Sequence, residues 1–180
     1  MQKAKLILIP VPLAAENASL VMPGYIAKEI ESLEFFVVEN IRTARRMLRQ
    51  MGYKMDFDSI RFFEMGKNAD LKNFNEALQV LKNGKDVGLM SEAGNPCIAD
   101  PGYEMVAMAH ENNFIVKPLV GPSSILMALV ASGFSGQQFT FNGYLPIEES
   151  QKITVILFPL LYIRALPNWH FLLPEEPVSK

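Results

Sequence analysis

The sequence predicts an α/β protein whose sheet is mainly parallel. Short apolar runs with the character of buried strands alternate with stretches in which apolar residues recur every three or four positions. This alternation continues through residues 1–119, and the segments between successive strands are long enough to hold a helix. Because parallel strands need such crossover connections, βαβ units are favoured over hairpins.

Five strands are predicted, each from a short apolar run, at residues 6–9, 35–38, 60–65, 87–90 and 114–119. Apolar positions at helical spacing predict helices between them, within residues 26–33, 41–51, 71–81 and 103–110. Gly52 and Gly84 each follow one of these helices, where a glycine commonly ends the helical backbone. We therefore place an N-terminal α/β domain at residues 1–119.

A second α/β domain is predicted to begin at residue 120 and to run, in shortened form, to residue 180. Residues 120–124 contain glycine, proline and serine and have the character of a hinge. The apolar stretch 125–131 predicts a short buried helix, and residues 139–141 predict the first strand of this domain. After Glu149 the character of the sequence changes, which makes residues 151–180 an atypical tail.

Composition narrows the class of protein. The chain has 180 residues, 49% of them apolar, and a net charge of −2, which fits a globular protein and not a disordered one. A single cysteine excludes an internal disulfide framework, and with only two histidines we expect no metal site. The apolar run 153–163 is broken by Pro159 and is shorter than the roughly 20 residues that a membrane-spanning helix needs. We expect a cytoplasmic protein with no membrane partner.

Two loops have the position and composition of ligand-binding loops, because ligands of parallel α/β proteins bind beyond the carboxyl ends of strands. Residues 91–102 (SEAGNPCIADPG) follow the fourth strand, and Gly94 allows a ligand to approach the backbone closely. Residues 121–124 place Ser123 and Ser124 at a helix start, where free N–H groups and hydroxyls suit a carboxylate or a phosphate. An ordinary turn is the alternative for each loop taken alone.

The loop after the first strand, residues 10–19, contains no glycine. Loops that cradle phosphates in dinucleotide-binding and P-loop proteins carry glycines at this position. Both of these classes are therefore disfavoured.

Charged residues follow the second predicted strand. Glu39 comes directly after the strand and is a candidate for substrate contact, or alternatively caps the helix that starts at Ile41. Four arginines on that helix form a stripe that could grip the phosphates of RNA, with a solvated helix face as the alternative. They are Arg42, Arg45, Arg46 and Arg49.

Three blocks in order resemble signature segments of the tetrapyrrole methylase superfamily. They read SEAGNPCIADPGYEMV, PLVGPSSILMALVASG and FTFNGYLP. The closest branch is the one that methylates the ribose 2′-hydroxyl of a cytidine in small-subunit ribosomal RNA. IPVP near the start and VENIRTARRML resemble further segments of that branch more loosely. The resemblance covers residues 5–148.

This resemblance implies a two-domain homodimer that binds S-adenosylmethionine between its domains and methylates RNA. The catalytic base is not identified, and Glu39 and Arg42 are the candidates for substrate contact. The cofactor-binding residues that the resemblance implies come from three loops, and they are Leu13, Gly94, Asn95, Ile98, Ser123 and Ser124.

Departures from the family pattern keep two alternatives open. The first loop has Leu13 and Ala14 where the branch has isoleucine and glycine, and Asn40 and Ile41 replace an acidic residue and a threonine. One alternative is a methylase of a tetrapyrrole or another small molecule. The other is a truncated, non-catalytic relative that keeps the cofactor site.

Overall fold

The computed structural model describes residues 3–14, 18–65, 71–144 and 147–148. The chain divides into two compact units, Met1–Phe139 and Thr140–Lys180. All the helices and strands given below lie in the first unit. The predicted tail, residues 151–180, lies outside the described residues, and the predicted domain boundary at residue 120 stays a prediction.

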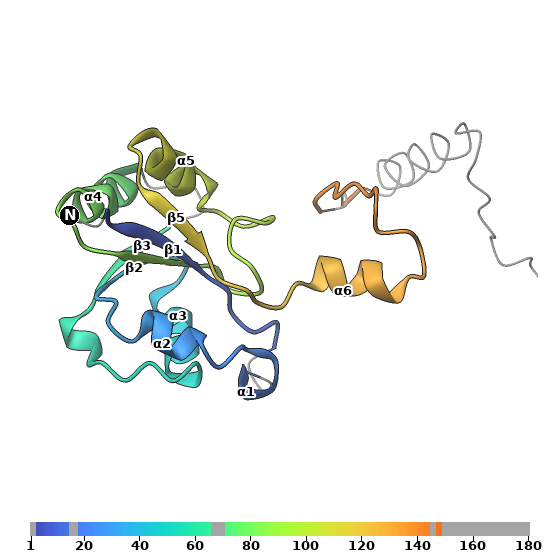
Figure 1. The fold of residues 1–180 in the computed structure, drawn as a ribbon, viewed down its shortest axis with the longest axis horizontal. Coiled ribbons are helices and arrows are strands. Elements are labelled where there is room, and N and C mark those ends of the chain that lie inside the picture. Colours follow the sequence, from blue (N-terminus) through green and yellow to red (C-terminus); the bar gives the residue numbers. More distant parts are fainter. Residues whose placement is uncertain (1–2, 15–17, 66–70, 145–146, 149–180) are drawn as a thin grey trace, which may run out of the picture. The chain divides into compact units, whose positions relative to one another are not determined.

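The first unit is built on a five-stranded parallel sheet, which confirms the predicted α/β class (Figure 1). The strand order is β3-β2-β4-β1-β5. Each strand is four or five residues long, and the five are β1 (Lys5–Ile9), β2 (Phe35–Val38), β3 (Arg61–Glu64), β4 (Val87–Met90) and β5 (Ile115–Pro118).

Helices cover both faces of this sheet (Figure 1). Apolar side chains of α2 (Ile26–Ile30) and α3 (Ile41–Gln50) pack on one face, and those of α4 (Leu71–Lys82) and α5 (Tyr103–Glu111) pack on the other. Three further helical elements are α1 (Ala18–Val21), the 3₁₀ turn η2 (Phe57–Ser59) and α6 (Ser124–Ala131).

Neighbouring strands β1 and β4 send the chain to opposite faces of the sheet. After β1 the chain passes to α2, and after β4 it passes to α5. The loops that leave such a pair of strands diverge, and ligands of open α/β sheets bind in the crevice between them. The strand order therefore favours a ligand site at the carboxyl edge of the sheet, near the ends of β1 and β4.

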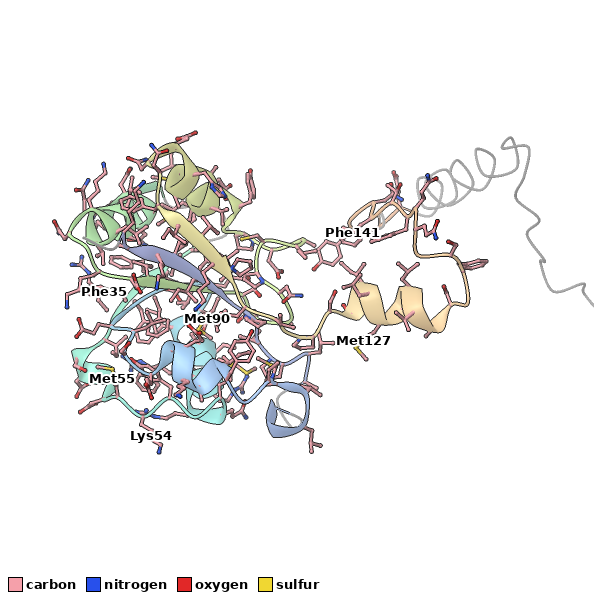
Figure 2. The ribbon with its side chains drawn as sticks, in the orientation of Figure 1. Phe35, Lys54, Met55, Met90, Met127 and Phe141 are labelled. Carbon is pink, nitrogen blue, oxygen red and sulfur yellow. The ribbon has the colours of Figure 1, made fainter. Side chains whose placement is uncertain are left out.

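The strands β4 and β2 are closely packed neighbours in the core. Met90 of β4 is 1% exposed and lies among the side chains packed in Figure 2. Phe36 of β2 is fully buried, with its ring edge-on to Tyr53 at 5.6 Å and stacked on Phe62 at 5.7 Å. A Cβ atom on Gly88 would lie 2.8 Å from Cδ1 of Phe36, so this part of the sheet has no free space.

Two predictions for residues beyond the sheet are wrong. Residues 125–131 do form a helix, α6, but none of its residues is buried. Its sequence is apolar on every side, and the part of the chain that the structure describes supplies no surface that covers it. Residues 139–141 form no strand, because a strand needs a neighbour with which to pair and the described residues offer none.

Candidate functional site

The loops after β1 and β4 are joined by paired backbone hydrogen bonds. The N–H of Val11 donates to the carbonyl oxygen of Gly94 at 2.9 Å, and the N–H of Gly94 donates to the carbonyl oxygen of Val11 at 3.1 Å. Gly94 has a φ of +70°, a backbone conformation that favours glycine. These bonds hold the first loop (residues 10–14) against the second loop (residues 91–102).

The loop after β5 meets the other two. A Cβ atom on Gly121 would lie 2.1 Å from Cβ of Pro10, so a side chain has no room there. A Cβ atom on Gly94 would lie 3.3 Å from Cδ2 of Leu13 and 3.6 Å from the carbonyl oxygen of Pro122. Glycine at both positions therefore lets the third loop (residues 120–123) approach the first and second loops closely.

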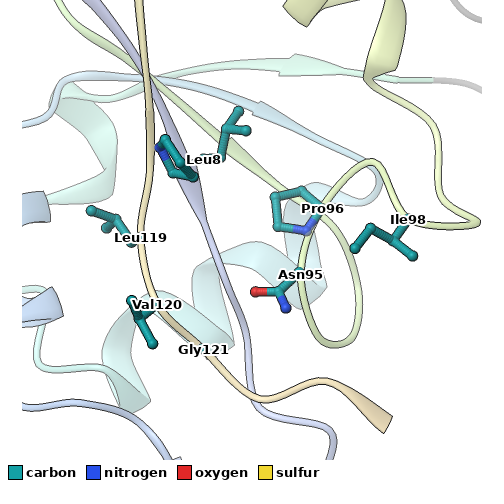
Figure 3. Close-up of a pocket in the computed structure, with 8 residues that line it drawn as sticks. Leu8, Asn95, Pro96, Ile98, Leu119, Val120 and Gly121 are labelled. Atoms are coloured by element: carbon teal, nitrogen blue, oxygen red, sulfur yellow. The ribbon is translucent and has the colours of Figure 1, made fainter. Parts of the chain in front are cut away.

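A cleft of about 400 Å³ opens where the second and third loops face each other (Figure 3). This volume lies within the usual range for a small-molecule site. The walls are mostly apolar, and Asn95 is the one lining residue with a polar side chain among the described residues. The lining residues are Leu8, Asn95, Pro96, Ile98, Pro118, Leu119, Val120 and Gly121.

The predicted cofactor-binding residues lie at or near this cleft to different degrees. Asn95 and Ile98 line it, and Ile98 is 45% exposed, which leaves its side chain available for a ligand. Gly94 and Leu13 lie beside each other at the junction of the first and second loops. The hydroxyl of Ser123 accepts a hydrogen bond from the N–H of Leu126 at 3.4 Å and so caps α6, whose first residue is Ser124. Neither serine lines the cleft.

The second loop holds two non-glycine residues in the left-handed conformation. They are Cys97 at φ +67° and Ala99 at φ +62°. Each such residue costs on the order of 1 kcal/mol, and backbone strain of this kind concentrates at ligand-binding sites. Burial raises the pKa of the Cys97 thiol to about 11, with smaller contributions from Asp100 and Glu104. The thiol is therefore protonated at neutral pH and is not a nucleophile.

Glu39 lies directly after β2 and contacts the second loop. Its Oε1 atom accepts a hydrogen bond from the N–H of Glu92 at 3.1 Å. Burial raises the pKa of the Glu39 carboxyl, the bond from Glu92 opposes this effect, and the charges of Asp100 and Glu92 add to it. Of the two roles open from the sequence, the cap belongs to Asn40, whose side chain accepts a hydrogen bond from the N–H of Thr43 at 3.0 Å. Glu39 is thereby left to face the second loop.

Three curated proteins are similar in sequence to this chain. Ribosomal RNA small subunit methyltransferase I of Mesorhizobium japonicum is 30% identical over 125 residues, which are 69% of this chain and 41% of that protein. The protein of the same name from Thermotoga maritima is 31% identical over 125 residues, 69% of this chain and 54% of that protein. The one from Micromonospora olivasterospora is 42% identical over 77 residues, 43% of this chain and 25% of that protein.

Over these 125 residues the chain is homologous to part of the methyltransferases of this name. The resemblance of its three sequence blocks is thus confirmed. The chain spans about half the length of the curated relatives it matches, since the aligned part is 41% of one and 54% of another. No family model matches the chain.

The arginine stripe of α3 is divided between two environments. The guanidinium of Arg49 lies 4.0 Å from the ring centroid of Phe57 and donates a hydrogen bond to the carbonyl oxygen of Tyr53 at 2.7 Å. Arg45 lies 5.5 Å from the ring centroids of both Phe57 and Phe62. All four arginines are exposed, but Arg42 and Arg46 lie over no described aromatic ring. The stripe that the sequence predicts is therefore not uniform.

Two contacts that hold the third loop were not predicted. The phenol oxygen of Tyr25 accepts a hydrogen bond from the N–H of Val120 at 2.7 Å, and Val120 lines the cleft. Nζ of Lys117, in β5, lies 2.5 Å from Oε2 of Glu29, in α2. Both contacts connect the start of the third loop to α2, and each spans more than 80 residues of sequence. No local pattern signals contacts of such separation.

Two negative findings apply to the described residues alone. No helix among them is long and apolar enough to cross a membrane. Within the same residues, no group of three or more histidine, cysteine, aspartate or glutamate side chains is placed to hold a metal ion.

Proposed function

We propose that the chain binds S-adenosylmethionine in the cleft at the carboxyl edge of its sheet and transfers the methyl group to a ribose hydroxyl of ribosomal RNA. The observation that carries this proposal is one cleft of about 400 Å³ between the loops after β4 and β5, with the loop after β1 held against the loop after β4 by backbone hydrogen bonds. We infer the cofactor from the methyltransferase activity that the relatives' name states. That name also gives ribosomal RNA as their substrate.

The cofactor would be held by the residues predicted from the sequence. Asn95 can donate and accept hydrogen bonds toward the polar edge of an adenine or a ribose. Ile98 and Leu13 offer apolar surface for a flat base, and Gly94 allows close approach of the ligand to the backbone. Ser123 and Ser124 supply hydroxyls at the start of α6, where the free N–H groups suit the cofactor's carboxylate.

The chemistry required of the protein is mainly positioning. The bound cofactor supplies a methyl group activated by a sulfonium, and the protein aligns the acceptor with it. The apolar walls at Leu8, Pro118 and Val120 exclude water from the cleft. Tyr25 fixes the Val120 wall through its hydrogen bond and so belongs among the positioning residues.

We assign Glu39 and Arg42 to the acceptor. Glu39 faces the second loop at the end of β2, and its carboxylate can accept a hydrogen bond from a ribose hydroxyl and draw off its proton. Arg42 lies in the first turn of the helix that follows and can neutralise a neighbouring phosphate. Both residues lie at the same edge of the sheet as the cleft.

Glu39→Gln is expected to lower kcat/KM for RNA at least about a hundredfold, because glutamine can accept the hydroxyl's hydrogen bond but cannot take its proton. The charged carboxylate is the active form, so activity falls as the pH drops through the pKa of Glu39. Burial raises this pKa, so the fall begins above the ordinary range for glutamate. The pH profile of methyl transfer measures this acidic limb, which the variant should lack.

Glu34→Gln is the matched control, because Glu34 precedes the same strand at the opposite edge of the sheet. It should keep both the rate and the acidic limb. An unchanged pH profile in Glu39→Gln would remove Glu39 from the reaction.

Departures from the family pattern favour a second candidate function. Asn40 and Ile41 replace an acidic residue and a threonine after β2, where the substrate is expected to bind. In this case the chain is a cofactor-binding relative that does not complete the transfer. The second domain from residue 120 and the homodimer stay predictions in both candidate functions.

Titration calorimetry with S-adenosylmethionine and S-adenosylhomocysteine tests the cofactor. Binding of both is expected, and a folded sample that binds neither contradicts the proposal. Transfer of a labelled methyl group to unmodified small ribosomal subunits then tests the reaction. Cofactor binding without transfer supports the second candidate, and transfer only to corrin or porphyrin precursors would show a tetrapyrrole methylase.

A further inference from the structure

We propose that Arg42 and Arg46 of α3 form a phosphate-binding surface for RNA, while Arg45 and Arg49 of the same helix serve the protein's own packing. This inference rests on the proposed function, since it names the surface that would hold the RNA substrate. Sequence spacing groups all four arginines together, and the structure separates them into two pairs.

Arg45 and Arg49 are engaged by aromatic side chains. Arg49 lies over the ring of Phe57 at 4.0 Å and also donates to the carbonyl oxygen of Tyr53. Arg45 lies over Phe57 and Phe62, each at 5.5 Å from the ring centroid. An arginine on an aromatic face gains energy from the ring's charge distribution and covers apolar surface with its stem. These two side chains therefore stabilise the packing of α3 against Phe57 of η2 and Phe62 of β3.

Arg42 and Arg46 have no such role within the described part of the chain. They are exposed, as are Arg45 and Arg49, but neither lies over a described aromatic ring or within 4.0 Å of a described carboxylate in an ion pair. They are four residues apart on a helix, so their Cβ atoms are neighbours about 6 Å apart on one face. Two like charges at this spacing repel, which destabilises the helix unless an anion lies between or above them.

The position of Arg42 adds a second cost. It lies in the first turn of α3, where the helix dipole favours anions and disfavours a cation. The carboxylate of Glu64 also lies at this helix start, where Oε1 accepts a hydrogen bond from the N–H of Ile41 at 3.2 Å. Oε1 of Glu64 is thus occupied by the backbone, and an external anion is the partner that relieves the arginine pair.

The position of this surface near the second loop of the cleft favours RNA as the anion. Arg42 lies three residues after Glu39, whose carboxylate contacts the second loop of the cleft. Arg46 lies one turn farther along the helix. A strand of RNA whose ribose reaches the cleft would therefore have its next phosphates close to this pair. Planar guanidinium groups match phosphate oxygens in two-pronged hydrogen bonds.

The experiment compares three double variants of the full chain. Arg42→Gln with Arg46→Gln removes two charges from the proposed surface, and Arg42→Lys with Arg46→Lys keeps them. Lys82→Gln with Lys85→Gln removes two charges at the far end of α4 and beyond, as a control of equal net charge. Binding of a fluorescently labelled single-stranded RNA and of unmodified small-subunit ribosomal RNA is measured against salt concentration, and cofactor binding is measured by calorimetry.

We expect the glutamine pair at 42 and 46 to weaken RNA binding at least tenfold at low salt. The slope of log affinity against log salt should fall by about 1.4, for two phosphate contacts to a single strand. The lysine pair should keep most of the slope, the control should keep both slope and affinity, and cofactor affinity should be unchanged in all three.

Three results would overturn this inference. The glutamine pair could bind RNA as the wild type does, or the control could lose as much affinity as the glutamine pair. A wild-type chain that binds the cofactor but no RNA also overturns it, while leaving the cofactor proposal in place. Failure of the cofactor proposal is seen separately, because S-adenosylmethionine would then give no binding heat in the calorimeter.

Discussion

Gly121→Ala is expected to weaken the binding of S-adenosylmethionine by about a hundredfold, as measured by titration calorimetry. The added Cβ atom would lie 2.1 Å from Cβ and 2.4 Å from Cγ of Pro10. Pro10 is a rigid ring on the buried first loop, so the third loop must move away from it. Overpacking of this kind costs roughly 1–3 kcal/mol, and a hundredfold loss of affinity is about 2.7 kcal/mol.

Gly24→Ala is the matched control, because a Cβ atom there meets nothing within 4 Å. It should bind the cofactor as the wild type does. The unfolding transition of Gly121→Ala should stay cooperative, because the strain is confined to loops that can separate. Wild-type cofactor affinity in Gly121→Ala would show that close packing of the third loop on the first is not needed for the site.

Phe36→Ala is expected to lower the free energy of unfolding by about 3–5 kcal/mol, the usual cost of removing a buried phenylalanine. Phe36 is fully buried and contacts the rings of Tyr53 and Phe62. Its removal leaves a cavity beside Gly88, which has no side chain with which to fill it. Urea denaturation followed by circular dichroism measures the change.

Phe139→Ala provides the comparison, since Phe139 is 52% exposed. Its effect should be within about 0.5 kcal/mol, as for most surface substitutions. Equal effects of the two substitutions would contradict the assignment of Phe36 to the core.

The sheet could be predicted from the sequence because its signal is local. Each strand is a short apolar run followed by a helix with its own apolar face, and both patterns are readable within a dozen residues. The ligand loops could be placed for the same reason, since they follow strands directly. Gly94 is predicted on this basis and Asn95 from the family resemblance, and the structure places them beside and in the cleft.

The remaining features depend on distant residues or on surfaces that composition does not reveal. The hydrogen bond between Tyr25 and Val120 joins residues 95 positions apart, and nothing near either residue indicates it. The arginines of α3 have the same charge and helical spacing, so only the position of Phe57 and Phe62 divides them. The apolar sequence of α6 indicates a need for burial, but it cannot say whether a covering surface is at hand.

The strand order also has a consequence for folding. β2 and β3 are neighbours in sequence and in the sheet, so they can pair early. β1 pairs only with β4 and β5, and therefore waits until more than 80 further residues have emerged from a ribosome. Contacts of such separation form late because the loop that they close is long. The cleft is lined by residues of β1 and β5 and of the loops after β4 and β5, so the binding site is completed in the last steps of folding.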